Sequence, residues 1–228
     1  MFDISSISLF STLSKEESKE LSHYIITETY KKKDVIFSEG DPPEWFYVVA
    51  EGKVKITKVS HEGKELILEI IPPNDIFGGI AVIKGFPYPA NAVAMEDTKI
   101  IKLSRSDLMK IIDRFPTVMF CIAQSIGDRV KVSHETLKNI ALERIEARIA
   151  SLLLKLADKT GEKTPDGLSI EIKLTRQDIS EMVGTTVETT IRTMSKFKKM
   201  GIISEKTGNI IIKDIKKLRK VIDPSEGL

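Results

Sequence analysis

A charged pair on a short helical segment is the feature of the sequence with the clearest chemical use. In the segment LTRQDISEMVGTTVETTIRTMSKFKKMGIIS (Leu174–Ser204), Glu188 and Arg192 are four residues apart and share one helix face. In the DNA major groove, an arginine can donate two hydrogen bonds to guanine O6 and N7, and a glutamate can accept one from cytosine N4. Val187 and Ile191 lie beside them and could touch a thymine methyl group. These four residues are therefore the predicted base-reading group.

The same residues have a purely structural interpretation. Thr185 and Glu188 have the spacing of a capping box, in which the glutamate folds back onto the start of its own helix. Glu188 and Arg192 also have the spacing of an ordinary helix-surface ion pair. The exposed apolar Ile191, next to Arg192 and followed by lysines, favours the DNA interpretation.

The elements around this face follow a recurrent pattern. Thr175 with Asp178 predicts the start of one helix, Gly184 a turn, and Thr185 or Thr186 the start of a second helix that ends near Met200. Two short helices joined in this way form a helix-turn-helix, and GIISEKTGNIIIKD predicts a β-hairpin after it, the wing of a winged helix. Within the second helix the spacing predicts three inward-facing residues: Thr190, Met194 and Phe197.

Positive charge is concentrated in this part of the chain. Residues 144–228 carry 17 Lys and Arg against 12 Asp and Glu, whereas residues 1–143 carry 18 against 21. Such asymmetry is expected when one end of a protein meets a polyanion. The predicted phosphate contacts are Thr175, Arg176, Thr186, Lys196, Lys199 and Lys206, with Lys198 and the KDIKKLRK tail as further candidates.

The region before this basic part predicts a different architecture. Residues 1–20 indicate a short N-terminal helix, and residues 24–104 contain short alternating runs such as KVKITKV and ELILEI between Gly, Pro, Asn and Asp. These features predict antiparallel strands in a sandwich or small barrel, with HEGKE (His61–Glu65) at a hairpin tip. After the later helix of residues 145–158, GEKTPDG predicts a surface turn and LSIEIKL a strand.

A long helix is predicted to begin at Pro116, with apolar residues recurring at three-, four- and seven-residue steps. Part of this stripe is expected to pack on the chain's own barrel. The rest is expected to pair with a second copy, with Ile122, Ile126, Val130 and Leu137 as the predicted dimer interface. The predicted domains are residues 1–115, 116–143 and 144–228.

Composition limits the chemistry that the chain can perform. The single cysteine, Cys121, excludes a cysteine-ligated iron–sulfur cluster. His23, His61 and His134 are isolated, so no metal site is predicted. No apolar run reaches the length of a membrane span, and the N-terminus lacks the pattern of a signal peptide, so we expect a cytoplasmic protein without membrane contact.

Family resemblance extends over nearly the whole chain. The segment LTRQDISEMVGTTVETTIRTMSKFKKMGII resembles the helix-turn-helix of the cyclic-AMP receptor protein and fumarate–nitrate reductase regulator (CRP/FNR) family. KKKDVIFSEGDPPEWFYVVAEGKVKI and DIFGGIAVIKGFPYPANAVAMEDTKIIKLS resemble its cupin-like sensor barrel. The resemblance implies an α+β fold with an antiparallel sensor barrel, a dimerisation helix and a winged helix-turn-helix. It also implies a homodimeric transcriptional regulator that binds a palindromic operator in double-stranded DNA and contacts RNA polymerase, with the loop 160–167 as one candidate surface.

Individual residues follow or depart from the family pattern. Glu188 and Arg192 match its base-reading pair, and Val187 matches the oxygen-responsive branch, which usually has serine at the position of Ile191. Cyclic-nucleotide binders have a glutamate for the ribose and an arginine for the phosphate where this chain has Gly79 and Tyr88. Cyclic AMP is therefore not the expected effector.

The expected effector pocket comprises Gly78, Gly79, Tyr88, Pro89, Asn91, Ser133 and His134. A neutral or aromatic small molecule, a haem with a His or Met axial ligand, and no effector at all are the options that remain. The alternatives to an effector-controlled regulator of this type are a cyclic-nucleotide-responsive regulator, a cupin-like enzyme and a binding module that does not touch DNA. No catalytic constellation is apparent, so an enzyme is not expected.

Overall fold

The computed structural model describes Ile7, Phe10, residues 14–206 and residues 208–223. The chain divides into two compact units, residues 1–131 and 132–228, and each is described by itself. Within the described residues, no helix combines the length and the hydropathy that crossing a bilayer requires.

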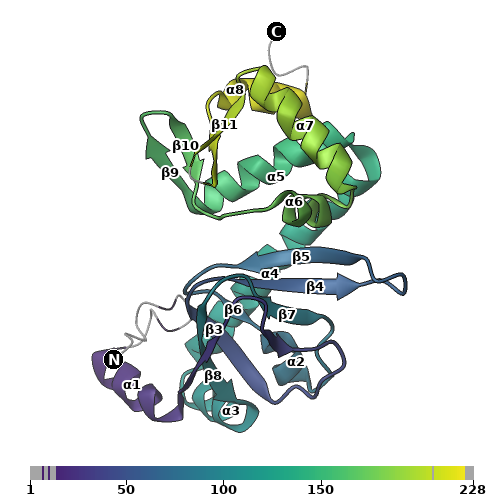
Figure 1. The fold of residues 1–228 in the computed structure, drawn as a ribbon. Helices are drawn as coiled ribbons and strands as arrows, with labels where there is room; N and C mark the ends of the chain where they lie inside the picture. The colour runs from purple at the N-terminus through teal and green to yellow at the C-terminus, as the bar shows by residue number, and fades with distance from the viewer. Residues whose placement is uncertain (1–6, 8–9, 11–13, 207, 224–228) are drawn as a thin grey trace. The chain divides into compact units, whose positions relative to one another are not determined.

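The first unit is built on two four-stranded antiparallel sheets (Figure 1). One sheet has the order β1-β8-β3-β6, and the other has the order β2-β7-β4-β5. The strands of the first are β1 (Ile26–Tyr30), β8 (Thr98–Ser104), β3 (Trp45–Glu51) and β6 (Ile76–Phe77). Those of the second are β2 (Val35–Phe37), β7 (Asn91–Ala94), β4 (Val54–Val59) and β5 (Glu65–Ile71). The predicted antiparallel sensor fold is confirmed, although its two sheets remain separate and do not close into a continuous barrel.

The predicted hairpin of this unit has the expected geometry. Strands β4 and β5 pair from Val54 with Ile71 to Val59 with Glu65, and the HEGKE turn lies between them. Gly63 at its tip has φ of 78°, a left-handed conformation that suits glycine. The alternating residues of this hairpin therefore place one apolar side toward the interior of the unit, where Val54, Ile67 and Ile71 are buried.

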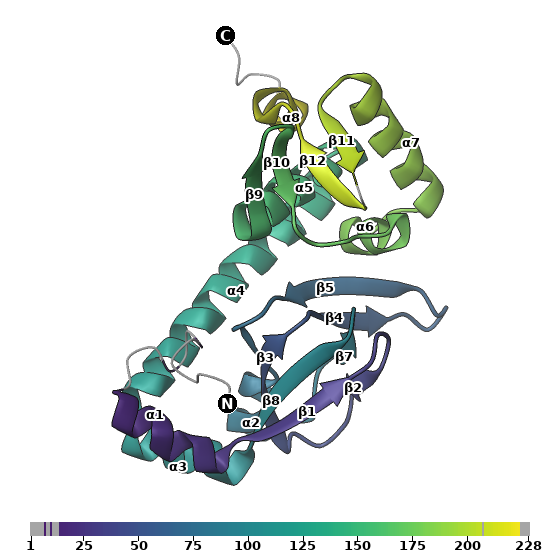
Figure 2. The ribbon, with the colours of Figure 1, turned by 60° about the vertical axis from the view of Figure 1, so that its left-hand side comes forward.

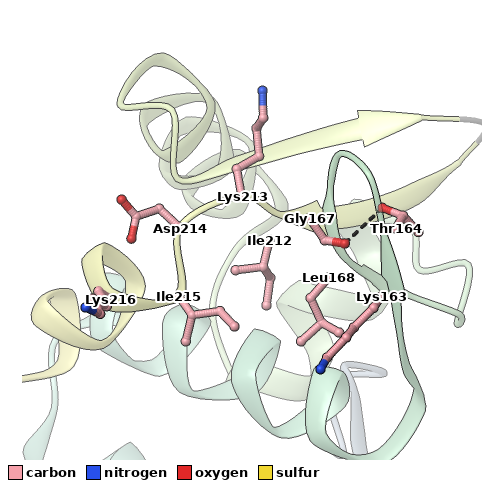
Figure 3. A pocket seen from close by; sticks show the side chains of 9 residues that line it. All are labelled: Lys163, Thr164, Gly167, Leu168, Ile212, Lys213, Asp214, Ile215 and Lys216. Atoms are coloured by element: carbon pink, nitrogen blue, oxygen red, sulfur yellow. Dashed lines mark hydrogen bonds between the residues drawn. The ribbon is translucent and has the colours of Figure 1, made fainter.

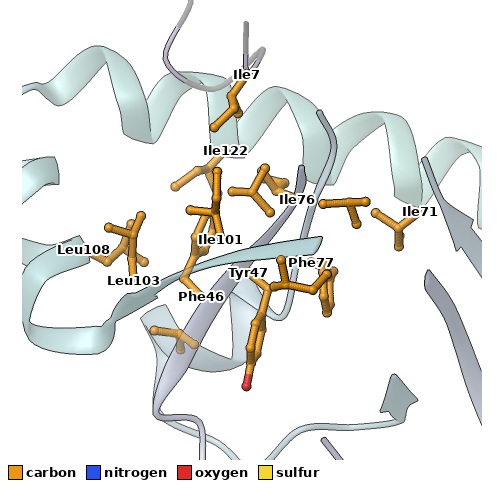
Figure 4. Close-up of a cluster of buried hydrophobic side chains, with 14 of the residues drawn as sticks. Ile7, Phe46, Tyr47, Ile71, Ile76, Phe77, Ile101, Leu103, Leu108 and Ile122 are labelled. Atoms are coloured by element: carbon orange, nitrogen blue, oxygen red, sulfur yellow. The ribbon is translucent and has the colours of Figure 1, made fainter. Parts of the chain in front are cut away.

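Short helices flank the sheets: α1 (Lys15–Leu21), the 3₁₀ turn η3 (Ser22–Tyr24), α2 (Gly79–Lys84) and α3 (Arg105–Arg114). Helix α1 begins with a capping box between Ser14 and Glu17, which confirms the N-terminal helix for the part of residues 1–20 that is described. The core between the sheets and helices is apolar and aromatic, and Figure 4 shows Phe46, Tyr47, Phe77 and Leu103 within it. Of the residues that the sequence assigned to an effector, Tyr88 belongs to this core.

The predicted long helix is present as α4 (Pro116–Leu142), with Pro116 as its first residue. Its apolar residues point in two directions. Val118 and Ile122 are buried in the core of the first unit, and Figure 4 shows Ile122 directed into that cluster. Phe120, Val130 and Leu137 are large, apolar and exposed. The helix ends at Leu142 and the next begins at Ile145, so a short break separates the two helices.

The second unit combines the end of α4 and further helices with a four-stranded sheet of order β11-β12-β10-β9 (Figure 2). Its further helices are α5 (Ile145–Thr160), α6 (Arg176–Val183), α7 (Val187–Lys199) and α8 (Ile215–Ile222). Its strands are β9 (Gly161–Thr164), β10 (Gly167–Ile170), β11 (Ile203–Lys206) and β12 (Asn209–Ile212). The helix-turn-helix and the wing predicted from the sequence are confirmed as α6–α7 and β11–β12.

One prediction for this unit was wrong. GEKTPDG is more than a surface turn, because its first four residues form strand β9 and pair with β10 from Gly161 opposite Ile170 to Thr164 opposite Gly167. The basic KDIKKLRK tail, for which the sequence predicted no element, is largely helical: Asp214 caps α8, and Leu218 is fully buried where α8 packs on α5. In both segments, pairing and packing partners distant in sequence decide the local structure.

Candidate nucleic-acid interface

The turn between α6 and α7 is fixed by local backbone chemistry. Thr175 and Asp178 form a capping box at the start of α6, as predicted. Gly184 ends α6 in the left-handed conformation, with φ of 68° and ψ of 50°. The N-cap of α7 is Thr186, whose hydroxyl accepts a hydrogen bond from the Thr189 amide. The two helices therefore meet at a defined angle without support from outside the unit.

This cap geometry resolves the structural interpretation of Glu188. Because Thr186 is the N-cap, the third helical residue is Thr189, and a capping box between Thr185 and Glu188 does not form. Within the described part of the chain, Glu188 and Arg192 also make no hydrogen bond or ion pair with each other or with other residues. Both side chains are therefore exposed and without a polar partner among the described residues.

Helix α7 has one buried and one exposed face. The buried face carries Thr190, Thr193, Met194 and Phe197, which confirms the three predicted inward residues. On the opposite face Glu188, Ile191 and Arg192 are exposed, and Val187 is half-buried beside them. Ile191 is 49% exposed, although an isoleucine on a helix of this length would ordinarily pack inward. The four predicted base-reading residues thus lie together on one accessible helix face.

The predicted phosphate contacts lie around this face, and several already have partners. Thr175 and Thr186 cap α6 and α7. Lys206 pairs with Asp166 at 2.9 Å, and Lys196 lies 3.7 Å from Glu146. Lys199, in the last turn of α7, is exposed.

Sequence reasoning missed the role of Glu205. This residue lies on the wing strand β11, and its carboxylate pairs with Arg176 of α6 and with Lys198 of α7, the latter at 2.6 Å. No local pattern indicates this, because Arg176 precedes Glu205 by 29 residues.

Tyr88, one of the expected effector-pocket residues of the first unit, is engaged in aromatic packing. Tyr88 is 2% exposed, and its ring stacks on Phe37 with the centroids 3.9 Å apart. The Tyr88 hydroxyl donates to the Trp45 carbonyl oxygen at 2.5 Å and lies 3.0 Å from the Trp45 amide, which donates to it. Burial raises the pKa of Tyr88, and burial together with the neighbouring Tyr88 also raises that of Tyr47. Both phenols are therefore neutral at physiological pH.

The glycines beside this tyrosine leave little space. Gly78 caps α2 in the left-handed conformation, with φ of 73°. At Gly79, an added Cβ would lie 2.8 Å from Phe46 Cε2, closer than such contacts ordinarily come. Pro89 is exposed, and the Asn91 side-chain oxygen accepts a hydrogen bond from the Glu39 amide at 2.8 Å.

The remaining predicted residues lie on α4. Ser133 and His134 are exposed and belong to the second unit, whereas the other pocket residues belong to the first. Of the predicted dimer residues, Ile122 is only 1% exposed within its own chain, Ile126 packs partly against the same core, and Val130 and Leu137 are exposed. Across the residues described, no three His, Cys, Asp or Glu side chains are grouped so as to hold a metal ion.

Comparisons with known proteins cover both units. Residues 27–115 match the cyclic nucleotide-binding domain family, and residues 147–221 match the Crp-like helix-turn-helix domain family. The CRP-like cAMP-activated global transcriptional regulator of Mycobacterium tuberculosis is 25% identical over 191 residues, 84% of this chain and 85% of that protein. The cyclic AMP receptor protein of Thermus thermophilus is 27% identical over 213 residues, 93% of this chain and 95% of the relative.

Solved structures extend the similarity to the fold. A CooA variant from Carboxydothermus hydrogenoformans has a TM-score of 0.80 at 26% identity and matches over 98% of this chain and 96% of its own. FixK2 from Bradyrhizobium japonicum has a TM-score of 0.77 at 22% identity over 86% of this chain and 96% of its own, which supports the fold alone.

Proposed function

Because the chain belongs to the CRP/FNR family of DNA-binding transcriptional regulators, we propose that it acts as a homodimer on a palindromic operator. In this proposal, α7 of each copy enters the major groove, and Glu188 and Arg192 read a G·A step in each half-site. Two half-sites are then spaced by about 34 Å, one turn of DNA. Val187 and Ile191 contribute apolar contacts to neighbouring bases.

The observation that carries the proposal is the state of Glu188 and Arg192. In the described part of the chain both side chains are exposed and neither has a hydrogen-bond or ion-pair partner. If these two residues stabilised α7, Glu188 would be expected to cap the start of the helix or to form an ion pair with Arg192. Neither interaction is present. The free hydrogen-bond donors of Arg192 and acceptors of Glu188, beside the exposed Ile191, suit contact with the edges of DNA bases.

Pairing of two copies is supported by the outward face of α4. Phe120, Val130 and Leu137 are exposed, with Phe120 and Leu137 each at 66%. They are spaced by ten and seven residues, which places them along one seam of a helix with coiled-coil periodicity. This seam, rather than Ile122, is the proposed core of the dimer interface.

For control, we propose an effector other than cyclic AMP, or none. The mycobacterial and Thermus relatives are named for cyclic AMP. In this chain, the position of the expected phosphate-binding arginine is Tyr88, which is buried and hydrogen bonded to backbone. The position of the expected glutamate is Gly79, which faces the ring of Phe46. Neither residue offers a charged contact to a phosphodiester.

RNA polymerase is the proposed protein partner, through a pocket at one edge of the second unit (Figure 3). The pocket has a volume of about 410 Å³ and lies between the β9–β10 turn and the start of α8. Its apolar floor and basic rim suit an acidic segment with an apolar side chain. The floor is formed by Leu168, Ile212 and Ile215, and the rim carries Lys163, Lys213 and Lys216 beside one carboxylate, Asp214. Replacing Lys163 and Lys216 with alanine should lower activated transcription in vitro without changing operator affinity.

The decisive experiment is selection from randomised duplex DNA with purified protein at physiological salt and no added effector. Enrichment of a palindrome with a G·A step in each half-site is the expected result. Sequence-blind, salt-sensitive binding would mean that a required effector is missing, and the absorption spectrum of the protein would then show whether haem is bound. No binding to any duplex, with or without extracted small molecules, would contradict the proposal.

A further inference from the structure

One carboxylate on the wing holds two cations of the helix-turn-helix. Glu205 lies on β11, Arg176 is the first residue of α6, and Lys198 lies near the end of α7. Arg176 Nη2 donates to Glu205 Oε1, and Lys198 Nζ lies 2.6 Å from Glu205 Oε2. Both carboxylate oxygens are therefore engaged, each by a side chain from a different helix.

The two cations border the face of α7 that is proposed to meet DNA. Lys198 follows Ile191 by seven residues, so the two side chains lie on the same side of the helix, two turns apart. Arg176 directly follows Thr175, the exposed cap of α6. Their side chains retain part of their exposure, 26% for Arg176 and 40% for Lys198. Phosphates on either side of an occupied groove would therefore come within reach of both.

Glu205 is charged when the wing is folded. Burial alone raises its pKa, but hydrogen bonds from Lys198 and Arg176 outweigh burial and leave the pKa below its ordinary value. At neutral pH the group is thus a carboxylate that accepts from an arginine fork and an ammonium. The oxygens of a phosphate diester can accept hydrogen bonds from the same arginine and lysine.

We propose that Glu205 is an internal competitor for DNA phosphate: its carboxylate binds Arg176 and Lys198 in the free protein, and duplex phosphates displace it on binding. This inference rests on the proposed DNA-binding function. Phosphate contacts carry no sequence information, so the competition weakens binding to every duplex by a similar factor. Glu205 thereby lowers the affinity for all duplex DNA and leaves the preference for the operator over other DNA unchanged.

The test compares two variants that remove the same charge. Glu205→Gln removes the competing carboxylate. Glu171→Gln is the control, because Glu171 lies in the same unit and, within the part of the chain that is described, accepts side-chain hydrogen bonds from the neutral Ser169 and Asn209 alone. Dissociation constants are measured by fluorescence anisotropy on an operator duplex and on a random duplex at several salt concentrations. Glu205→Gln should bind both duplexes about three- to tenfold more tightly than Glu171→Gln, as expected from losing two partly exposed ion pairs.

A mutant cycle identifies the cations through which the carboxylate acts. In a chain that already carries Arg176→Gln and Lys198→Gln, the further change Glu205→Gln should give no more tightening than Glu171→Gln does. Each cation substitution alone should reduce the slope of log affinity against log salt by about one. Thermal unfolding of every variant establishes that the unit is folded. If Glu205→Gln does not fold, the slopes of the two single cation variants decide the question.

Different outcomes separate the inference from the function on which it rests. Equal affinities of Glu205→Gln and Glu171→Gln, or weaker binding by Glu205→Gln, would overturn the inference and make Glu205 a structural or positioning residue. Unchanged salt slopes in both cation variants would overturn it as well. Failure of the unmodified protein to bind any duplex would instead contradict the proposed function.

Discussion

The two units retain different parts of the chemistry expected of their family. In the first unit, the position expected to bind a phosphate is held by Tyr88, which is buried, stacked on Phe37 and hydrogen bonded to Trp45. In the second unit, Glu188 and Arg192 are exposed and make no polar contact within the described chain. A residue already satisfied by its own fold serves stability, whereas an exposed and unpaired one remains available to a ligand. The proposed DNA contacts are therefore available in the second unit, whereas the position expected to bind a phosphate in the first unit is engaged by its own fold.

The largest effect is expected from placing an arginine at position 88 of the first unit, where cyclic-nucleotide binders are expected to have one. Tyr88→Arg places a guanidinium in a site that is 2% exposed, where the Tyr88 hydroxyl bonds the backbone of Trp45 and the carboxylates of Asp41 and Glu44 act on it only through space. A buried charge without a hydrogen-bonded counter-ion should reduce the free energy of unfolding by about 3–5 kcal/mol. Tyr88→Phe is the matched control and should lose only about 1–2 kcal/mol, for the two hydrogen bonds to Trp45. Chemical denaturation followed by Trp45 fluorescence measures both. Wild-type stability of Tyr88→Arg together with binding of cyclic AMP would mean that the site is open.

Alkaline pH should act on the two units unequally. All four tyrosines precede residue 89, and the folded state raises the pKa of buried Tyr47 and Tyr88. Because an unfolded tyrosine loses its proton near pH 10, this stability is complete below about pH 10 and is lost as the pH rises above it. Each of the two phenols contributes a slope of about 1.4 kcal/mol per pH unit.

The single tryptophan, Trp45, reports this loss from the first unit, while phenolate absorbance reports ionisation. The part of the phenolate absorbance that comes from Tyr47 and Tyr88 should change together with Trp45 fluorescence above pH 10, because these buried phenols ionise only on unfolding. Ionisation of all tyrosines near pH 10 without a change in Trp45 fluorescence would refute the closed aromatic core.

In the second unit, removing one proposed base contact tests whether the exposed face of α7 reads sequence. Arg192→Ala should weaken operator binding by about 1–3 kcal/mol and relax the preference at one base pair. The melting temperature should not change, since the structure gives Arg192 no polar partner among the described residues. Lys199→Ala on the same helix is the control: it should weaken operator and random duplexes alike and reduce the salt slope. Equal loss by Arg192→Ala on every sequence would remove Arg192 from the base-reading group.

The smallest expected effect is a change in stability when a methyl group is added at a glycine of the first unit. An added Cβ at Gly79 meets Phe46 Cε2 at 2.8 Å, whereas at Gly127 on α4 it meets no atom within 4 Å. Gly79→Ala should therefore destabilise the unit by about 1 kcal/mol or more through overpacking. Gly127→Ala should stabilise it by up to about 1 kcal/mol, because alanine favours a helix over glycine. Thermal melts at one protein concentration measure both, and effects of the same sign would contradict the difference in packing.

Local signals in the sequence predicted much of the fold. The capping pattern at Thr175, the glycine at Gly184 and the alternation around HEGKE each depend on residues within a few positions, and each prediction is confirmed. The inward face of α7 follows from helical periodicity in the same way. Helix α8 was missed because its lysines mask a single buried residue, Leu218, whose packing partner α5 lies far away in the sequence.

The sites were less accessible to sequence reasoning. The Tyr88 hydroxyl is hydrogen bonded to the backbone of Trp45, 43 residues away. No local sequence pattern shows whether such a tyrosine packs inside a core or lines an open pocket. Similarly, apolar spacing on α4 cannot distinguish Ile122, which enters the chain's own core, from Leu137, which faces outward. Glu205 appeared as one acidic residue in a basic wing, and only the folded unit brings it to Arg176 and Lys198.

Helix α4 links the fold of one chain to the proposed assembly of two. Val118 and Ile122 belong to the core of one chain, and the outward residues of the same helix form the seam of the proposed dimer. Dissociation of two copies would therefore leave apolar residues such as Phe120 and Leu137 in water on a helix that the first unit needs for its own core. By mass action, the midpoint of thermal unfolding should rise with total protein concentration, so dilution alone would loosen the sensor.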